Sequence, residues 1–150
     1  MIVMGYEAKL YRNTGTYAAP VWNEIANVKD LTLGGDAEEV DVTTRKNAGF
    51  KATVAGLKDA AVEFEMEWDT EDLDFSAFQD AFFATAAADK AIEVAVMDGD
   101  IAVTGSEGLR ATMAVTNFSR NEALGEALAV SVTLKPTYAD HPPEWYVVPA

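Results

Sequence analysis

The chain has 150 residues, of which 25 are acidic and 11 basic, giving a formal net charge of −14 at pH 7. Hydrophobic residues make up 49% and charged residues 24%, the composition of a globular protein and not of a disordered one. The acidic excess argues against binding nucleic acid by neutralising its phosphates. The absence of cysteine excludes disulfides, thiolate metal sites and cysteine nucleophiles.

The N-terminal stretch Met1–Gly5 lacks the basic start and the long apolar run of a signal peptide. No segment approaches the ~20 apolar residues that a membrane-spanning helix needs. A chain of this length can bury roughly 70% of the surface that its unfolded form exposes. We therefore expect a single domain over residues 1–150, made in the cytoplasm and independent of membranes.

Short alternating runs in the first half of the chain predict β-strands separated by turns. The expected strands cover residues 6–11, 28–33, 40–44, 50–57 and 60–68. Gly34-Gly35 should end the second strand, and Lys58-Asp59 should form the turn of a hairpin between the last two. The polar stretch Asp36–Gly49 is expected to be an extended loop around the brief third strand.

One helix is expected to interrupt the strands. Asp74 is a good N-cap, and Phe75, Phe78 and Phe82 follow at helical spacing. These three phenylalanines form an aromatic stripe on one side of the predicted helix. The stripe is expected to pack on the sheet as core, and not to hold a cofactor.

The second half of the chain returns to alternating runs. Strands are expected over residues 91–97, 101–104, 109–118 and 127–134. Asp98-Gly99 should form a tight hairpin turn, and residues 122–128, which contain Gly125, should form another turn. The tail from Tyr138 is expected to be irregular. The whole pattern amounts to some eight antiparallel strands and one helix.

The segment Val62–Asp69 alternates strictly, with Glu63, Glu65 and Glu67 on the face opposite its apolar residues. Carboxylates two residues apart on a strand lie about 6.5 to 7 Å apart, within the range of inverting glycosidases. Such an enzyme also needs one buried carboxyl with a raised pKa, whereas three neighbours that all point outward should be solvated. The pattern therefore argues against catalysis.

Other candidate sites lack the residues or the structural setting that their chemistry requires. His141 is the only histidine and lies in a proline-rich tail, a poor setting for a general base. Asp69–Asp74 resembles a calcium loop but lacks the glycine required at its sixth position. Gly34-Gly35 and Gly105–Gly108 lack the lysine and the strand-to-helix setting of a phosphate-binding loop. We expect no catalytic residue, no metal and no cofactor.

The charges are segregated along the chain. Val42–Lys58 contains four basic residues and no acid, whereas Asp59–Asp80 contains nine acids and no base. One interpretation is the solvated face of an acidic protein. The other is a self-assembling protein, in which a basic loop of one copy meets an acidic patch of its neighbour.

Several stretches together resemble the major tail tube proteins of tailed bacteriophages, in particular those with long non-contractile tails. They are Asp41–Asp69, then "FQDAFF", "VMDG" at 96–99, "TNFSRNEALGEA" at 116–127 and "VTLKPT" at 132–137. The resemblance covers most of the chain in the right order. Its motifs are patterns of strand and turn, and none is a catalytic signature.

The resemblance implies a fold of two packed antiparallel sheets, a β-sandwich, with one flanking helix. It implies hexameric rings that stack into a hollow tube in the virion tail, assembled in the host bacterial cytoplasm. The implied partners are further copies of the chain, the tape measure protein, and the tail initiator and terminator proteins. DNA would pass through without specific binding. The chain is expected to lack the C-terminal immunoglobulin-like domain of some relatives.

The resemblance also implies roles for particular residues. Glu63, Glu65 and Glu67 would line the lumen, although the sequence leaves open that they face outward. The loop Asp36–Gly49 would reach the next subunit or ring. Its candidate contact residues are charged, namely Asp36, Glu38, Glu39, Asp41, Arg45 and Lys46. The alternatives are an inner tube of a contractile tail or of type VI secretion, and a monomeric acidic β-sandwich binding module.

Overall fold

The computed structural model describes residues 2–150, which form one antiparallel sheet and one α-helix. The sheet has the strand order β2-β1-β5-β6-β7-β4-β3, and β8 also pairs with β6. The strands are β1 (Lys9–Asn13), β2 (Trp22–Glu24), β3 (Lys29–Asp41), β4 (Thr53–Glu67), β5 (Ala91–Met97), β6 (Glu107–Asn121), β7 (Ala129–Pro136) and β8 (Glu144–Val147). The helix is α1 (Leu73–Phe83), and three short 3-10 turns are η1 (Gly5–Glu7), η2 (Arg45–Asn47) and η3 (Ala87–Lys90).

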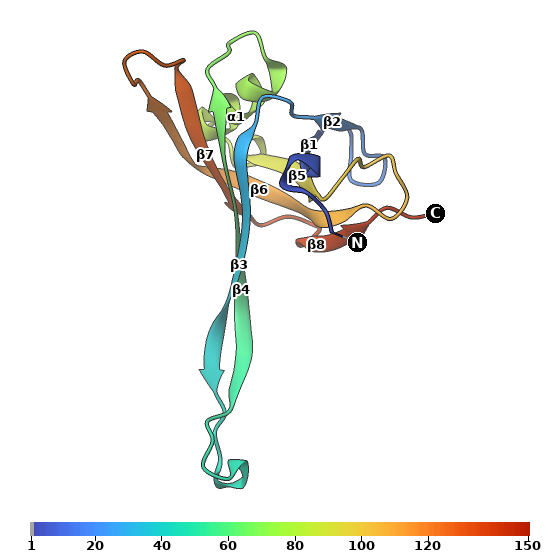
Figure 1. Cartoon of the computed structure of the whole chain (residues 1–150), viewed down its shortest axis with the longest axis vertical. Coiled ribbons are helices and arrows are strands. Elements are labelled where there is room, and N and C mark those ends of the chain that lie inside the picture. Colours follow the sequence, from blue (N-terminus) through green and yellow to red (C-terminus); the bar gives the residue numbers. More distant parts are fainter. Residues whose placement is uncertain (1) are drawn as a thin grey trace.

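Strand β6 joins the two halves of the sheet. Its first part pairs with β5 and β8, and its second part pairs with β7. The register shifts between Val115 and Asn117, and such an irregularity bends a strand. In Figure 1, β3 and β4 therefore run along the long axis of the molecule while β5 and the start of β6 run across it. The two sheets expected from the resemblance are two halves of one hydrogen-bonded sheet, and the mainly β class with a flanking helix is confirmed.

The main core lies between the two halves of the sheet and the helix, and a smaller cluster of Tyr11, Ala95 and Met97 lies apart from it. Alternate residues of each strand supply the main core, as the period of two requires. Its buried strand residues are Leu10, Val62, Phe64, Met66, Val94, Val96, Ala111, Met113, Val130, Val132 and Leu134. Helix α1 adds Phe75 and Phe78, which are fully buried and meet Trp68 and Phe64 edge-to-face. Phe82 is 38% exposed at the margin of this core.

The helix begins two residues earlier than the sequence predicted. Asp72 is the N-cap, and its carboxylate accepts a hydrogen bond from the Asp74 backbone N–H at 2.9 Å. Asp74 itself is buried, and it accepts hydrogen bonds from Arg12 and Asn23. The prediction of Asp74 as the cap was wrong because this carboxylate serves a tertiary contact with β1 and β2.

The largest correction concerns β3 and β4. Gly34-Gly35 does not end a strand, and Lys58-Asp59 does not form a turn, because both lie inside one long hairpin in which Gly35 pairs with Ala60 and Ala37 with Lys58. Glycine can continue a strand, and Lys-Asp lacks the glycine or asparagine that tight hairpin turns favour. The expected loop Asp36–Gly49 is therefore strand up to Asp41, and only its remainder is a turn.

Smaller differences follow from pairings between distant segments. Gly5–Glu7 forms a 3-10 turn, so β1 begins only at Lys9. Asp98-Gly99 does not form the predicted tight hairpin turn, and residues 101–104 do not form the predicted strand. Strand β5 instead joins β6 through a wider connection, which the Asp98 N–H closes by donating to the Glu107 carbonyl. The tail, expected to be irregular, contains β8, which pairs with residues 107–110 of β6.

Other predictions were confirmed. Strand β5 has the predicted bounds, and residues 122–128 form a turn in which Gly125 has a φ of 87°. Strand β7 lies two residues further along the chain than predicted. No helix among residues 2–150 is long and apolar enough to cross a membrane.

Candidate functional site

A two-stranded ribbon projects from the body of the protein (Figure 1). Strand β4 leaves β7 at Val62, and beyond that point β3 and β4 pair only with each other. We call residues 34–61 the arm and residues 42–52 its tip. None of the arm residues is buried. An isolated two-stranded hairpin is at best marginally stable in water, so the arm gains little stability from its own contacts.

The backbone of the tip has a defined turn. The Thr44 hydroxyl caps the 3-10 turn Arg45–Asn47 by accepting from the Lys46 N–H, and Ala48 and Gly49 then adopt left-handed conformations. The Asp41 carboxylate accepts hydrogen bonds from the hydroxyl and the N–H of Thr43. These bonds, first the one from the hydroxyl, hold the pKa of Asp41 below its ordinary value of 3.8.

The surface of the tip is basic and carries one large aromatic side chain. Arg45, Lys46 and Lys51 are exposed there, and Phe50 is 77% exposed. The candidate acids lie on the β3 strand of the arm and not at the tip. They are Asp36, Glu38, Glu39 and Asp41, all exposed. The structure thus separates the six predicted contact residues into a basic tip and an acidic stem.

The three glutamates lie on the outer face of β4, opposite Val62, Phe64 and Met66 of the core. Strand register places polar side chains in rows beside them. The row of Glu63 contains Thr32, Thr133 and Asn117, and the row of Glu65 contains Lys29, Ser131 and Ser119. Asp59 lies on the same side of β4, four residues before Glu63. We call Asp59, Glu63, Glu65 and Glu67 the acidic face.

Two lysines neutralise part of this face. Lys29 Nζ lies 2.7 Å from Glu67 Oε1, and this hydrogen bond raises the pKa of Lys29. Lys135 Nζ lies 3.1 Å from Asp59 Oδ2, and it relieves the repulsion between Asp59 and Asp36, which pair directly across the two strands. In the described part of the chain, Glu63 and Glu65 form no ion pair. The face is polar and net negative.

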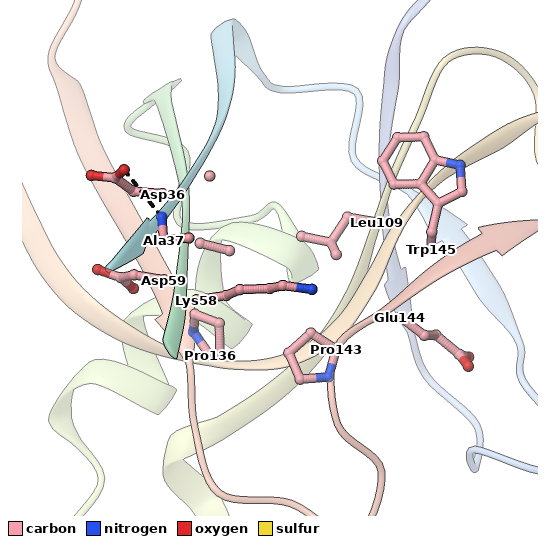
Figure 2. A pocket seen from close by; sticks show the side chains of 11 residues that line it. Asp36, Ala37, Lys58, Asp59, Leu109, Pro136, Pro143, Glu144 and Trp145 are labelled. Carbon is pink, nitrogen blue, oxygen red and sulfur yellow. Dashed lines mark hydrogen bonds between the residues drawn. The ribbon is translucent and has the colours of Figure 1, made fainter. Parts of the chain in front are cut away.

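A groove of about 750 Å³ lies where the arm joins the body (Figure 2). Small arm residues form one wall and residues near β8 form the other. The apolar part of its lining includes Leu109, Pro136, Pro143 and Trp145. The side chain of Lys58 points into the groove, whereas the carboxylates of Asp36, Asp59 and Glu144 at its border point away from it (Figure 2). Trp145 is 60% exposed, an unusual position for such a large apolar side chain.

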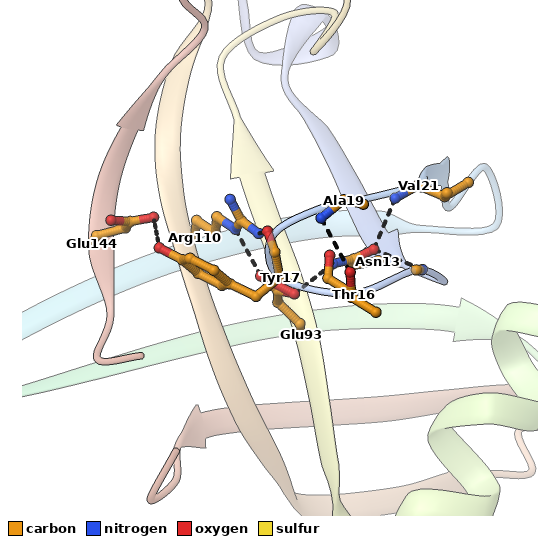
Figure 3. A network of polar contacts seen from close by, with 9 residues as sticks. Asn13, Thr16, Tyr17, Ala19, Val21, Glu93, Arg110 and Glu144 are labelled. Atoms are coloured by element: carbon orange, nitrogen blue, oxygen red, sulfur yellow. Dashed lines mark hydrogen bonds and ion pairs between the residues drawn. The ribbon is translucent and has the colours of Figure 1, made fainter. Parts of the chain in front are cut away.

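A polar network around Arg110 holds one wall of this groove (Figure 3). Arg110 is 6% exposed; its Nε donates to Glu93 at 2.7 Å, and its guanidinium lies 4.0 Å from the centre of the Tyr17 ring. The Tyr17 hydroxyl donates to Glu144 at 2.7 Å, which raises the pKa of Tyr17. The network ties the loop after β1 to β5, β6 and β8.

Sequence reasoning missed this network. Tyr17 and Glu144 are 127 positions apart, and Arg110 and Glu93 meet only through the pairing of β5 with β6. The alternation in β6 gives no signal for Arg110, because Arg110 lies on the face of the strand opposite Ala111 and Met113 of the main core. His141, considered above as a possible base, stacks on the Tyr17 ring with centroids 3.5 Å apart.

The other residues considered for chemistry are used by the backbone. The Asp69 carboxylate accepts from the Glu71 N–H, and Asp72 caps the helix. Among residues 2–150, no group of three or more His, Cys, Asp or Glu side chains is placed to hold a metal ion. Gly34 and Gly35 lie in β3, and Gly105 has a φ of 92° in the connection before β6.

No protein-family model matches the sequence, and no curated protein matches it. Solved structures do match. A protein in the tail of an empty gene transfer agent particle, refined with C6 symmetry, aligns with a TM-score of 0.70 at 16% identity, over 96% of this chain and 98% of that one. The protein of the SPP1 tail tube aligns with a TM-score of 0.73 at 11% identity, over 99% of this chain and 81% of that one.

A third match comes from another particle. A protein in the baseplate of the anti-feeding prophage aligns with a TM-score of 0.65 at 10% identity, over 99% of this chain and 97% of that one. At such low identities the likeness concerns the fold, and it extends over almost the whole chain, arm included. The fold expected from the sequence resemblance is thereby confirmed. This chain has the fold of phage tail tube proteins.

Proposed function

We propose that the protein is the building block of a phage-type tail tube, in which six copies form a ring and rings stack into a hollow conduit for DNA. The observation that carries this proposal is the arm. A hairpin that leaves the body and buries none of its residues needs a partner to cover it. The tail tube fold supplies that partner as another copy of the same chain.

The arm carries apolar side chains that solvent now contacts. Val40, Val54, Leu57 and Phe50 are all exposed, and together they give the arm an apolar surface along its length. Contact between an arm and a different surface of the next copy is heterologous, and such contacts build open filaments when they do not close into a ring. Stacking through the arm therefore produces a tube that grows by addition of rings.

The edges of the sheet supply the contacts within a ring. β3 and β2 are the end strands of the sheet, and each has one edge without a strand partner among the described residues. Open edges cause aggregation in a monomer, but in a ring each edge meets the next subunit and the sheet becomes continuous. The exposure of these strands thus serves assembly.

The acidic face supplies the wall of the lumen. Duplex DNA carries one negative charge per ~1.7 Å of its axis and binds tightly to basic surfaces by releasing counterions. In this wall of glutamates among hydroxyl and amide side chains, the cations Lys29 and Lys135 are already paired with Glu67 and Asp59, so the net charge that DNA meets is negative. Screening over about 8 Å at physiological salt confines the repulsion to near contact, so DNA can enter and slide.

This function includes no catalysis. The partners are further copies of the chain, the tape measure protein that the tube encloses, and the initiator and terminator proteins at its ends. Assembly takes place in the host bacterial cytoplasm, and the product is the tail of the virion. DNA passes through the lumen without sequence-specific contacts.

Electron microscopy of the purified protein over a concentration series, with and without the tail initiator, tests the proposal. Rings and tubes with a central hole are expected, and averaged images give the symmetry. A variant in which a two-residue turn replaces residues 37–58 serves as the control and should not form tubes. Solitary particles under all conditions, initiator included, would refute the proposal in favour of a monomeric acidic binding module.

The match to a baseplate protein shows that this fold also occurs outside tail tubes, which keeps one second candidate open, an inner tube protein of a contractile particle. Such a tube is surrounded by a sheath, whereas a non-contractile tail tube is not. Purification of the intact particle and mass spectrometry of its components separate the two. A sheath protein present in numbers equal to this chain would identify the contractile type.

A further inference from the structure

The outer edge of β8 has no strand partner among residues 2–150, because β8 pairs only with residues 107–110 of β6. We propose that this edge and the groove beside it form a docking site for an extended peptide segment of another protein, which carries an apolar and an acidic side chain. The inference goes beyond the proposed function, in which copies of the chain meet through the arm and through the edges of β2 and β3. Those contacts leave the β8 edge free for a different partner.

The backbone of β8 offers hydrogen bonds at this edge. The Glu107 carbonyl of β6 accepts from the Asp98 N–H, so the backbone of Glu107 faces β5 and not β8. Val147 lies directly opposite Glu107, and the two are therefore a pair without mutual hydrogen bonds. Because the backbone direction alternates along an antiparallel strand, the N–H and C=O groups of Trp145 and Val147 point away from β6. A strand added at this edge can bond to them, as in β-augmentation.

The groove selects an apolar side chain from the added strand. Trp145 lies directly opposite Leu109 of β6, and Leu109 packs against the main core. Trp145 therefore extends a row of core side chains to the edge of the sheet, where 60% of it is exposed. A residue opposite Trp145 on the added strand would continue this row. The groove volume of about 750 Å³, bounded also by Pro136 and Pro143, accommodates such a side chain.

One charge faces the groove. The Lys58 side chain points into it (Figure 2), and among residues 2–150 Lys58 forms no ion pair. The carboxylates at the border of the groove point away and do not neutralise this ammonium. A carboxylate of the occupant, two residues from the apolar side chain and so on the same face of its strand, would meet Lys58. Opposite charges at such a contact fix the register of the partners.

The wall formed by β8 is held in place before docking. The Glu144 carboxylate accepts from the Tyr17 hydroxyl at 2.7 Å on the side away from the groove, and β8 is paired with β6. Neither β8 nor Trp145 then has to be ordered when the peptide arrives, which lowers the entropic cost of binding.

Selection of short random peptides by mRNA display against the purified full-length protein tests the chemistry of the occupant. The protein has a formal net charge of −14, so nonspecific attraction favours basic peptides. We expect instead peptides in which an acidic residue lies two positions from an apolar one. Selection against Lys58→Glu should change the acidic residue to a basic one, whereas Lys51→Glu, at the arm tip, should leave it acidic. Enrichment of the same peptides by the Lys58 variant would overturn the proposal.

Fluorescence anisotropy with the strongest selected peptide tests the groove and the strand edge. Trp145→Ala should weaken binding by about tenfold or more. Leu57→Ala, which removes an apolar side chain that is 76% exposed on the arm, should leave binding unchanged. N-methylation of one alternate set of peptide nitrogens should also weaken binding by about tenfold, because it removes the donors that face β8, and methylation of the other set should be tolerated. Binding that neither Trp145→Ala nor methylation affects would overturn the docking site.

The outcomes separate this inference from the proposed function, since peptide binding is measured on the unassembled protein. Binding to preformed tubes as well would support a partner other than this chain. A peptide that binds the free protein and is excluded from tubes would show that another copy fills the groove, which overturns the inference and leaves the tube function intact. Failure to form rings or tubes, even with the tail initiator, would overturn the proposed function, while the Lys58 and Trp145 variants would still decide the docking site.

Discussion

Strand β4 runs through both the body and the arm, but different contacts stabilise the two parts. Strand β4 buries Val62, Phe64 and Met66 in the body, whereas Val54 and Leu57 of the same strand are exposed in the arm. The body closes its apolar face on itself and on α1. The arm leaves its apolar residues exposed, and in the proposed tube another copy covers them. Secondary structure alone therefore does not tell whether a segment is stabilised by its own chain or by assembly.

The substitution Phe78→Ala tests most directly whether the body is stabilised by its own core. Phe78 is fully buried and meets Phe64 edge-to-face with ring centroids 5.3 Å apart. Removing a buried phenylalanine leaves a cavity and lowers the free energy of unfolding by about 3 to 5 kcal/mol. Urea denaturation of the unassembled protein measures it. Phe83→Ala, on the same helix but exposed, should change the value by less than about 1 kcal/mol; equal effects would mean that α1 does not seal the core.

The body could be predicted from sequence to a large extent. β5, β7, the core half of β4 and the phenylalanines of α1 follow from local periodicity, which reports directly on a buried face. The bend of β6, the pairing of β8 and the union of two sheets into one could not be predicted. They depend on which distant segments pair, and no local pattern specifies that.

A second test concerns the buried charge of the body. Arg110→Ala would leave Glu93, which now accepts from Arg110 at 2.7 Å, without its cation. Breaking one side of a buried pair costs about 3 kcal/mol or more. Denaturation should show this loss, whereas Arg120→Ala, which removes an exposed partner of Glu122, should cost less than about 1 kcal/mol. Similar values for both variants would mean that the network contributes little to the fold.

The arm was harder to predict than the body. Its charges were recognised, and Arg45 and Lys46 do lie together at the tip. The hairpin itself was missed because Gly34, Gly35 and Ala60 break the apolar alternation that identifies a strand with a buried face. A ribbon exposed on both sides has no such face within its own chain. The groove and the Arg110 network were missed for another reason, since their members come from opposite ends of the sequence.

Substitutions in the arm should have the opposite effect: the stability of the subunit should be unaffected, and assembly should be impaired. Arg45→Glu combined with Lys46→Glu changes exposed side chains, so the free energy of unfolding of the subunit should shift by less than about 0.5 kcal/mol. Tube yield should fall by about tenfold, and more at low salt than at high salt because the contact is electrostatic. Sedimentation at several salt concentrations measures it. Lys90→Glu, on η3 of the body, is the matched control; unchanged yield for the tip variant would remove these residues from the interface.

The acidic face can be separated from both the core and the arm. Glu63→Lys combined with Glu65→Lys alters two side chains without ion pairs among the described residues, so folding and tube yield should persist. DNA ejection from particles built with this variant should slow severalfold, because a basic wall retains DNA by counterion release. Fluorescence of a DNA-binding dye follows the ejection. Glu122→Lys combined with Glu126→Lys, both exposed in the turn between β6 and β7, is the control. Normal ejection by the Glu63 and Glu65 variant would place the acidic face outside the lumen.

The smallest effect is expected in the arm tip, which has no buried core and is held by local hydrogen bonds. Thr43→Val removes the hydroxyl that is the main cause of the low pKa of Asp41, so this pKa should move back toward 3.8. Because the folded pKa is depressed, ionised Asp41 stabilises the tip above the unfolded pKa, and this contribution disappears as the pH falls through the folded value. NMR titration of the carboxylate measures it, with Thr116→Val on β6 as the control. An unchanged Asp41 titration in the Thr43 variant would mean that the backbone N–H alone orders the tip, and that its shape is set by the turn at Ala48 and Gly49.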